Sequence, residues 1–143
     1  MNKWIFFSGA LAVALGAFGA HALRPFLDDK LSHTYETAVQ YQFYHTLILA
    51  FTILWNKGSA SSLIQKSQSF FVAGLILFCG SLYAMVFLSV SGFSGARFLG
   101  MVTPFGGLSF LAGWGTLFYH FMKKPNTATK NAESGHDQNS VFK

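Results

Sequence analysis

Polar and ionisable side chains gather at one place in this apolar chain, where the first apolar run ends and the second begins. Imidazole and carboxylate groups are ligands that zinc and iron accept. Ionisable groups at membrane depth are costly, so by default they suggest a functional site. The candidate site is this polar cluster: His21, Arg24, Glu36, Gln40, Gln42 and His45.

Helical geometry argues against a metal site in this cluster. His33 and Glu36 share a helix face, but His45 lies nine residues beyond Glu36, about 13 Å along the axis and on the opposite face. One helix therefore cannot bring all three to one ion, and we expect no metal and no cofactor. His45 needs a partner from another helix, for which His21 or Arg24 is suitably placed.

Two interpretations of the polar cluster stay open beside a metal or proton site. In the first, the side chains lock the first two helices together through hydrogen bonds, with Glu36 paired to Arg24. In the second, they bind a small molecule or a lipid headgroup. The first is favoured, because interhelical hydrogen bonds are the ordinary use of polar groups between membrane helices.

The sequence contains no motif of a known catalytic centre. It has no phosphate-binding loop, no CxxC pair, no HExxH and no nucleophile placed beside a base. Cys79 is the only cysteine, so it forms no intrachain disulfide. We therefore expect a protein that is not an enzyme, without catalytic residues.

The elements that position the cluster are membrane-spanning helices. Of 143 residues, 52% are apolar and 10% are charged, against about 25% charged in soluble domains. A helix needs about 20 apolar residues to cross a bilayer. The sequence predicts an all-α integral membrane four-helix bundle (residues 1–123), followed by a disordered polar tail at 124–143. The predicted spans are about 4–23, 32–56, 69–90 and 98–121.

The sequence leaves open where the second and fourth helices begin. Ser32 is a candidate N-cap for the second helix. Pro104 either opens the fourth helix, with Thr103 as its N-cap, or kinks a helix that begins near Phe98.

Small residues along two spans predict close helix packing. Gly9, Gly16 and Ala20 follow one face of the first span, and Gly106 and Gly113 follow one face of the fourth. Between membrane helices, small residues let backbones approach and gain dispersion energy. Packing within the chain is favoured over a dimer interface.

The distribution of basic residues predicts the orientation. Lys3 and Ala20-His21-Ala22 resemble a secretory signal, but the apolar run is long and three spans follow, which favours a retained helix. Four spans place both termini on one side. That side has six lysines near the membrane against three basic residues opposite, so both termini are expected in the cytoplasm. The six are Lys3, Lys57, Lys66, Lys123, Lys124 and Lys130.

Three segments in order resemble a known family: GALAVALGAFGAHAL, YETAVQYQFYHTLILAF and LGMVTPFGGLSFLAGW. They are similar to the domain-of-unknown-function 423 family of small membrane proteins, which is related to the eukaryotic transmembrane protein 256. The resemblance implies a four-helix protein of the inner or plasma membrane. The resemblance implies no biochemical activity and no catalytic residue. The shared segments contain His21, Gln42 and His45.

Together these observations predict a non-enzymatic component of the bacterial cytoplasmic membrane. Such a component binds a partner protein, a lipid or a small apolar molecule, with a homo-oligomer as a further option. The lysines lie beside apolar spans or in the tail, so nucleic acid is not an expected partner. The alternative is a small transporter or a proton- or metal-handling protein that uses the His/Gln/Tyr side chains. A lipid-acting enzyme comes third.

Overall fold

The protein is helical almost throughout in a computed structural model that describes residues 3–59 and 61–123. No strand occurs in these two ranges. The tail predicted at 124–143 lies outside the described residues. The α-helices are α1 (Lys3–Phe18), α2 (Asp29–Ser59), α3 (Ser62–Gly74), α4 (Gly80–Val90) and α5 (Thr103–Met122).

Shorter helical turns join these helices into four rods. A π-helical turn at Gly19–Leu23 and a 3-10 turn at Arg24–Phe26 extend α1. A second π-helical turn, Leu75–Cys79, joins α3 to α4 as one continuous rod. A 3-10 segment at Ser94–Met101 leads into α5. The result is the all-α four-helix bundle that the sequence predicts.

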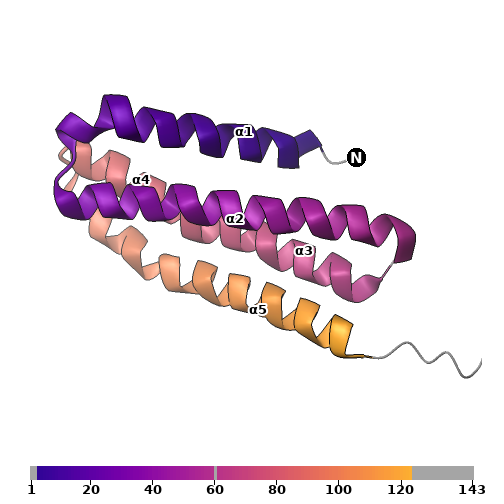
Figure 1. Ribbon diagram of the computed structural model, residues 1–143. Coiled ribbons are helices and arrows are strands. Elements are labelled where there is room, and N and C mark those ends of the chain that lie inside the picture. The colour runs from indigo at the N-terminus through magenta and orange to yellow at the C-terminus, as the bar shows by residue number, and fades with distance from the viewer. Residues whose placement is uncertain (1–2, 60, 124–143) are drawn as a thin grey trace, which may run out of the picture.

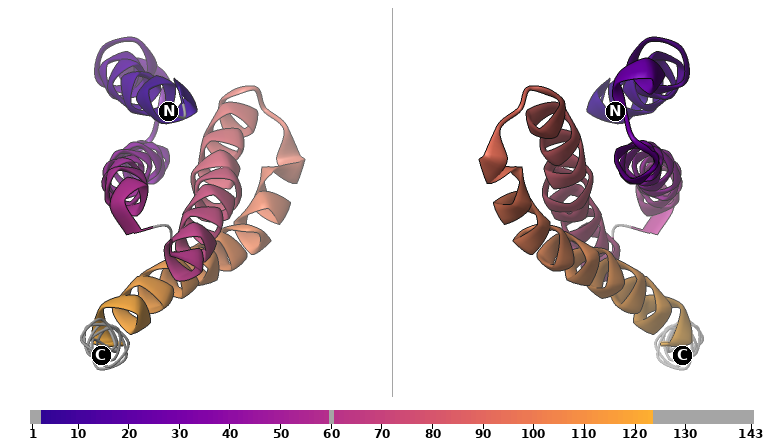
Figure 2. Two further views of the ribbon diagram at one scale, coloured as in Figure 1. Left: turned by 90° about the vertical axis from the view of Figure 1, so that its right-hand side faces the viewer. Right: turned by 90° about the vertical axis from the view of Figure 1, so that its left-hand side faces the viewer.

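The four rods run back and forth between two ends of the molecule (Figure 1). The start of α1, the connection from α2 to α3 and the end of α5 lie at one end, which we call the terminal end. The connections from α1 to α2 and from α4 to α5 lie at the other, which we call the Arg24 end. Seen along the bundle, α1 lies beside α2, while α5 crosses the α3–α4 rod obliquely (Figure 2).

Helix α2 begins earlier than the candidate N-cap Ser32. Its first residue is Asp29, and the carboxylate of Asp28 accepts a hydrogen bond of 2.7 Å from the Leu31 backbone N–H. Aspartate is a strong N-cap because its charge also interacts favourably with the helix dipole. Ser32 therefore lies inside the helix, where its hydroxyl is free to bond another side chain.

Pro104 lies in the first turn of α5, where a missing N–H costs no hydrogen bond. The residue that precedes the helix is Val102 and not Thr103, and the chain before it is 3-10 rather than α-helical. Thr103 instead uses its hydroxyl to bond Ser81 of α4, at 2.8 Å.

Glycines on α5 permit a close contact with the α3–α4 rod. A Cβ atom at Gly106 would lie 2.7 Å from the Phe78 Cα, so only glycine permits this backbone approach. A Cβ at Gly113 would instead lie 2.8 Å from the side-chain ring of Phe71. On α1 the contacts are looser: a Cβ at Gly16 would lie 3.4 Å from the Val39 side chain.

Three segments have the length and apolar composition to cross a membrane: Lys3–Phe26, Ser62–Val90 and Phe98–Met122. Helix α2 is long enough at 31 residues, but its first half is polar, so its crossing stays a prediction. Large apolar side chains such as Phe6, Leu54, Ile76 and Phe118 are more than half exposed. A bilayer would cover such surfaces, because lipid tails are as apolar as these side chains.

Candidate functional site

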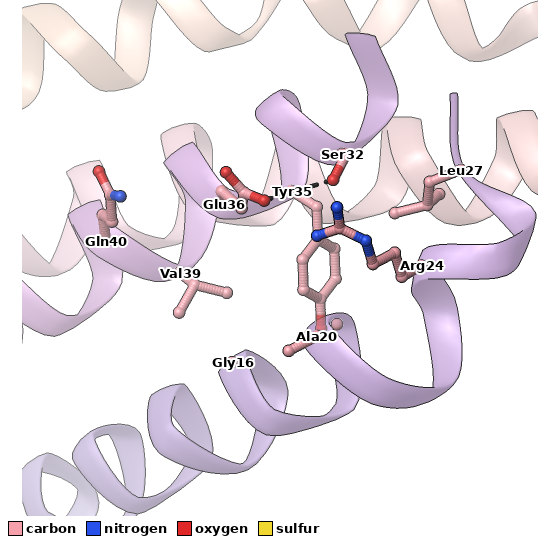
Figure 3. Close-up of a pocket in the computed structure, with 10 residues that line it drawn as sticks. Gly16, Ala20, Arg24, Leu27, Ser32, Tyr35, Glu36, Val39 and Gln40 are labelled. Atoms are coloured by element: carbon pink, nitrogen blue, oxygen red, sulfur yellow. Dashed lines mark hydrogen bonds between the residues drawn. The ribbon is translucent and has the colours of Figure 1, made fainter. Parts of the chain in front are cut away.

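A groove between the first rod and α2, near the Arg24 end, is the candidate site (Figure 3). We call it the α1–α2 groove; its volume is about 210 Å³. One wall comes from the first rod and the other from α2. The lining residues are Gly16, Gly19, Ala20, Arg24, Leu27, Ser32, Tyr35, Glu36, Val39 and Gln40.

The α2 wall carries a row of polar side chains. Ser32, Glu36 and Gln40 follow one another at intervals of four residues, so they lie on one helix face. The Ser32 hydroxyl donates a hydrogen bond of 3.3 Å to the Glu36 carboxylate (Figure 3). This bond leaves most of the carboxylate's capacity to accept hydrogen bonds unused.

The wall of the first rod is made of small residues, which leave room for the groove. Tyr35 crosses from α2, and its hydroxyl donates a hydrogen bond of 2.7 Å to the Leu15 carbonyl oxygen. A side chain at Gly19 would overlap the Tyr35 ring. The Tyr35 side chain is 2% exposed, and its hydrogen bond joins the two walls of the groove.

Arg24 lines the groove without forming an ion pair with Glu36. Both side chains are exposed and both line the groove (Figure 3), yet Glu36 bonds Ser32 and no ion pair joins it to Arg24 in the part of the chain that is described. The structure thus brings the two charges to one groove, but not into the contact expected from the sequence. Each retains hydrogen-bonding capacity for a ligand.

Gln42 lies outside the groove and bridges three helices. Its side-chain N–H donates to the Ser8 carbonyl oxygen at 3.0 Å, and its carbonyl oxygen accepts from the Tyr83 hydroxyl at 2.8 Å. One turn away, the hydroxyls of Ser8 and Thr46 share a hydrogen bond of 2.9 Å. These hydrogen bonds join α2 to both α1 and α4.

His45 lies among aromatic rings on another face of α2. Its ring stacks on Phe110 of α5, with ring centroids 3.5 Å apart and planes 17° apart. Its Nδ1 is bonded to the Tyr41 carbonyl oxygen at 2.8 Å, and Tyr41 also stacks on it from the same helix. The partner of His45 is therefore an aromatic face of α5, not His21 or Arg24.

Replacing His45 with phenylalanine tests whether its ring is a packing element. In His45→Phe the stack on Phe110 is kept and one local hydrogen bond is lost. The benzene ring is larger than imidazole, so we expect the free energy of unfolding to fall by about 1–3 kcal/mol, as overpacking of a buried site usually costs. Thermal unfolding in detergent, followed by circular dichroism, measures this. A collapse of the fold would show that the imidazole nitrogens matter more than the ring.

The remaining histidine of the cluster, His21, is exposed in the π-helical turn and does not line the groove. His33 is exposed on α2 and does not line it either. In the described ranges, no three His, Cys, Asp or Glu side chains come together as metal ligands would. The polar cluster thus divides into three parts: the groove (Arg24, Glu36 and Gln40), the Gln42 bridge and the His45 stack.

Sequence reasoning missed the residues that complete these parts. Ser32 and Tyr35 of the groove, and Tyr83 and Phe110 as partners, were not among the candidates. The spacing of Ser32, Glu36 and Gln40 was a usable signal for the groove. No sequence signal identified the partners on α4 and α5, because the register of these helices against α2 is set by the fold.

Comparison with known proteins places the chain among membrane proteins without an assigned activity. A family model described as "Protein of unknown function (DUF423)" matches residues 15–107. The chain is 41% identical over 105 residues to the UPF0382 membrane protein YwdK of Bacillus subtilis, covering 73% of this chain and 80% of that protein. No solved structure gives a significant match.

Two further relatives extend this similarity. The UPF0382 inner membrane protein YgdD of Escherichia coli K12 is 38% identical over 107 residues. The match covers 75% of this chain and 77% of YgdD. A UPF0382 membrane protein of Haemophilus influenzae is 35% identical over 116 residues, covering 81% and 88%. The matched region includes the α1–α2 groove, since all of its lining residues lie within 15–107.

Proposed function

The chain belongs to the DUF423 family of small integral membrane proteins, and from that premise we propose that it is a non-enzymatic membrane component that binds a lipid or another small ligand in the α1–α2 groove. The observation that carries this proposal is the unpaired placement of Arg24 and Glu36 in one groove. Both side chains line the same groove and neither is used up in an ion pair with the other, so both are available to a ligand.

The size and composition of the groove also favour a small ligand. Its volume of about 210 Å³ is below the roughly 300–1,000 Å³ of pockets that hold drug-sized molecules. Its walls combine small and apolar residues with a few convergent polar groups, as binding pockets usually do. Both charged side chains are exposed, so a ligand reaches them without any helix moving.

Filling the groove with a larger side chain tests the proposal. In Ala20→Leu the new side chain occupies the groove, whereas Ala17→Leu adds the same bulk at an exposed position that does not line it. Native mass spectrometry of the full chain purified from bacterial membranes should show a one-to-one lipid or small-molecule adduct. We expect Ala20→Leu to reduce its occupancy about tenfold, a loss of about 1.4 kcal/mol, and Ala17→Leu to leave it unchanged. Equal occupancy in all three proteins would overturn the proposal.

We further propose that the protein lies in the bacterial cytoplasmic membrane with both termini inside. The relative YgdD is named an inner membrane protein. The start of α1, the α2–α3 connection and the end of α5 share one end of the bundle (Figure 1), and that end carries Lys3, Lys57 and Lys123. Excess lysine and arginine mark the cytoplasmic side of short loops.

Reporter fusions at Lys143 test this orientation. A green fluorescent protein fused there should be fluorescent, and an alkaline phosphatase fused at the same position should be inactive, because the phosphatase needs the oxidising periplasm for its disulfides. Fusions to a chain shortened before α5, which removes one predicted crossing, should give the reverse pattern. An active phosphatase at Lys143 would contradict the predicted topology.

A further inference from the structure

The two charges of the α1–α2 groove define which ligand fits it. Arg24 supplies a guanidinium from the first rod, and Glu36 supplies a carboxylate from α2 (Figure 3). Glu36 lies about 10 Å along α2 from its first residue, Asp29, at about 1.5 Å per residue. It therefore lies about two turns inside the helix, exposed on the face that lines the groove.

We infer that the groove binds a zwitterion of headgroup size, with its anionic group on Arg24 and its protonated amine on Glu36. This inference rests on the proposed function and adds the chemistry of the ligand. A zwitterion compensates both charges and leaves the filled site neutral. A purely anionic ligand would leave Glu36 without a cation, and a purely cationic one would leave Arg24 without an anion.

The chemistry of each wall matches one part of such a ligand. A guanidinium binds a phosphate or carboxylate through two parallel hydrogen bonds. A protonated primary amine has three N–H donors, and the α2 wall offers the Glu36 carboxylate and the Gln40 side-chain carbonyl as acceptors one turn apart. Since Ser32 already donates to Glu36, the carboxylate is held in place for the amine.

A phosphoethanolamine group has this chemistry, whether as the headgroup of phosphatidylethanolamine or as a free molecule. Trimethylation of the amine to choline keeps the positive charge but removes every N–H donor, so phosphatidylcholine should bind more weakly. Phosphatidylglycerol keeps the phosphate but has no amine. The three lipids thus separate the contribution of Arg24 from that of Glu36.

The test titrates the full chain in detergent with short-chain phosphatidylethanolamine, phosphatidylcholine and phosphatidylglycerol that carry the same acyl chains, and measures binding by native mass spectrometry. We expect phosphatidylethanolamine to bind about tenfold more tightly than the other two. Glu36→Gln should abolish the preference over phosphatidylcholine, and Arg24→Gln should weaken all three. Asp29→Asn and Lys30→Gln remove the same charges at exposed positions outside the groove and should change nothing.

The possible outcomes separate this inference from the proposed function. If Ala20→Leu blocks lipid binding but the three lipids bind equally, the groove is a binding site and the zwitterion is wrong. If no lipid and no free phosphoethanolamine binds, the zwitterion is wrong, and the proposed function is then decided by the native adduct and its response to Ala20→Leu. Competition by free phosphoethanolamine at equal concentration would identify a free zwitterion as the ligand, and binding of the diacyl form alone would identify a lipid; either result supports the inference. The comparison of lipids on the unmodified chain holds even if a variant misfolds.

Discussion

Replacing Gly106 with alanine should destabilise the bundle more than replacing another glycine of α5 with alanine. The added Cβ would lie 2.7 Å from the Phe78 Cα, and a backbone atom inside a helix cannot rotate away as a side chain does. Overpacking costs about 1–3 kcal/mol and occasionally more, and we expect Gly106→Ala at the upper end. The free energy of unfolding, measured by steric trapping in bicelles, gives the value directly.

Gly115 provides the matched control on the same helix. A Cβ placed there meets no other atom within 4 Å, so Gly115→Ala adds a methyl group without a clash. Alanine favours the helix over glycine by up to about 1 kcal/mol, and this variant should be as stable as the unmodified protein or slightly more so. If Gly106→Ala were equally harmless, α5 would not approach the Leu75–Cys79 turn as closely as the structure shows.

The all-α bundle could be predicted from the sequence, because long apolar runs are typical of membrane-spanning helices. It also predicted the small residues Gly106 and Gly113 as contacts. It did not predict the π-helical turns at Gly19–Leu23 and Leu75–Cys79, since an extra residue in a helical turn leaves no mark on an apolar run. The early start of α2 was missed because Asp28 and Ser32 are both good N-caps, and only the chain path after Arg24 decides between them.

The candidate site could be predicted only in part. What could be predicted depends on whether the contacting side chains lie on one helix or on different helices. Residues on one helix, such as Glu36 and Gln40, can be placed on a common face from spacing alone. Partners on different helices cannot, because they depend on the register and rotation of each rod. His45 was expected to meet the first span for this reason, whereas the stacking with Phe110 depends on how α5 crosses the bundle.

Replacing Gln42 with leucine should loosen α1 from the rest of the bundle. Gln42 is 6% exposed and joins Ser8 of α1 to Tyr83 of α4 through two hydrogen bonds. Interhelical hydrogen bonds in membrane proteins contribute about 0.6 kcal/mol on average and up to about 1.7 kcal/mol each. With two bonds lost, we expect the free energy of unfolding to fall by about 1–3 kcal/mol. Amide hydrogen exchange in α1 should accelerate more than exchange in α5.

A double-mutant cycle separates the bridge from the simple loss of packing. Tyr83→Phe removes the hydroxyl that donates to Gln42, so the two substitutions together should cost less than the sum of their separate costs. The coupling should be about 0.6–1.7 kcal/mol. Gln65→Leu, an exposed glutamine on α3, is the control for the chemistry of the exchange and should be close to neutral. Strict additivity would mean that Gln42 and Tyr83 act on stability independently, and that their hydrogen bond does not tie α2 to α4.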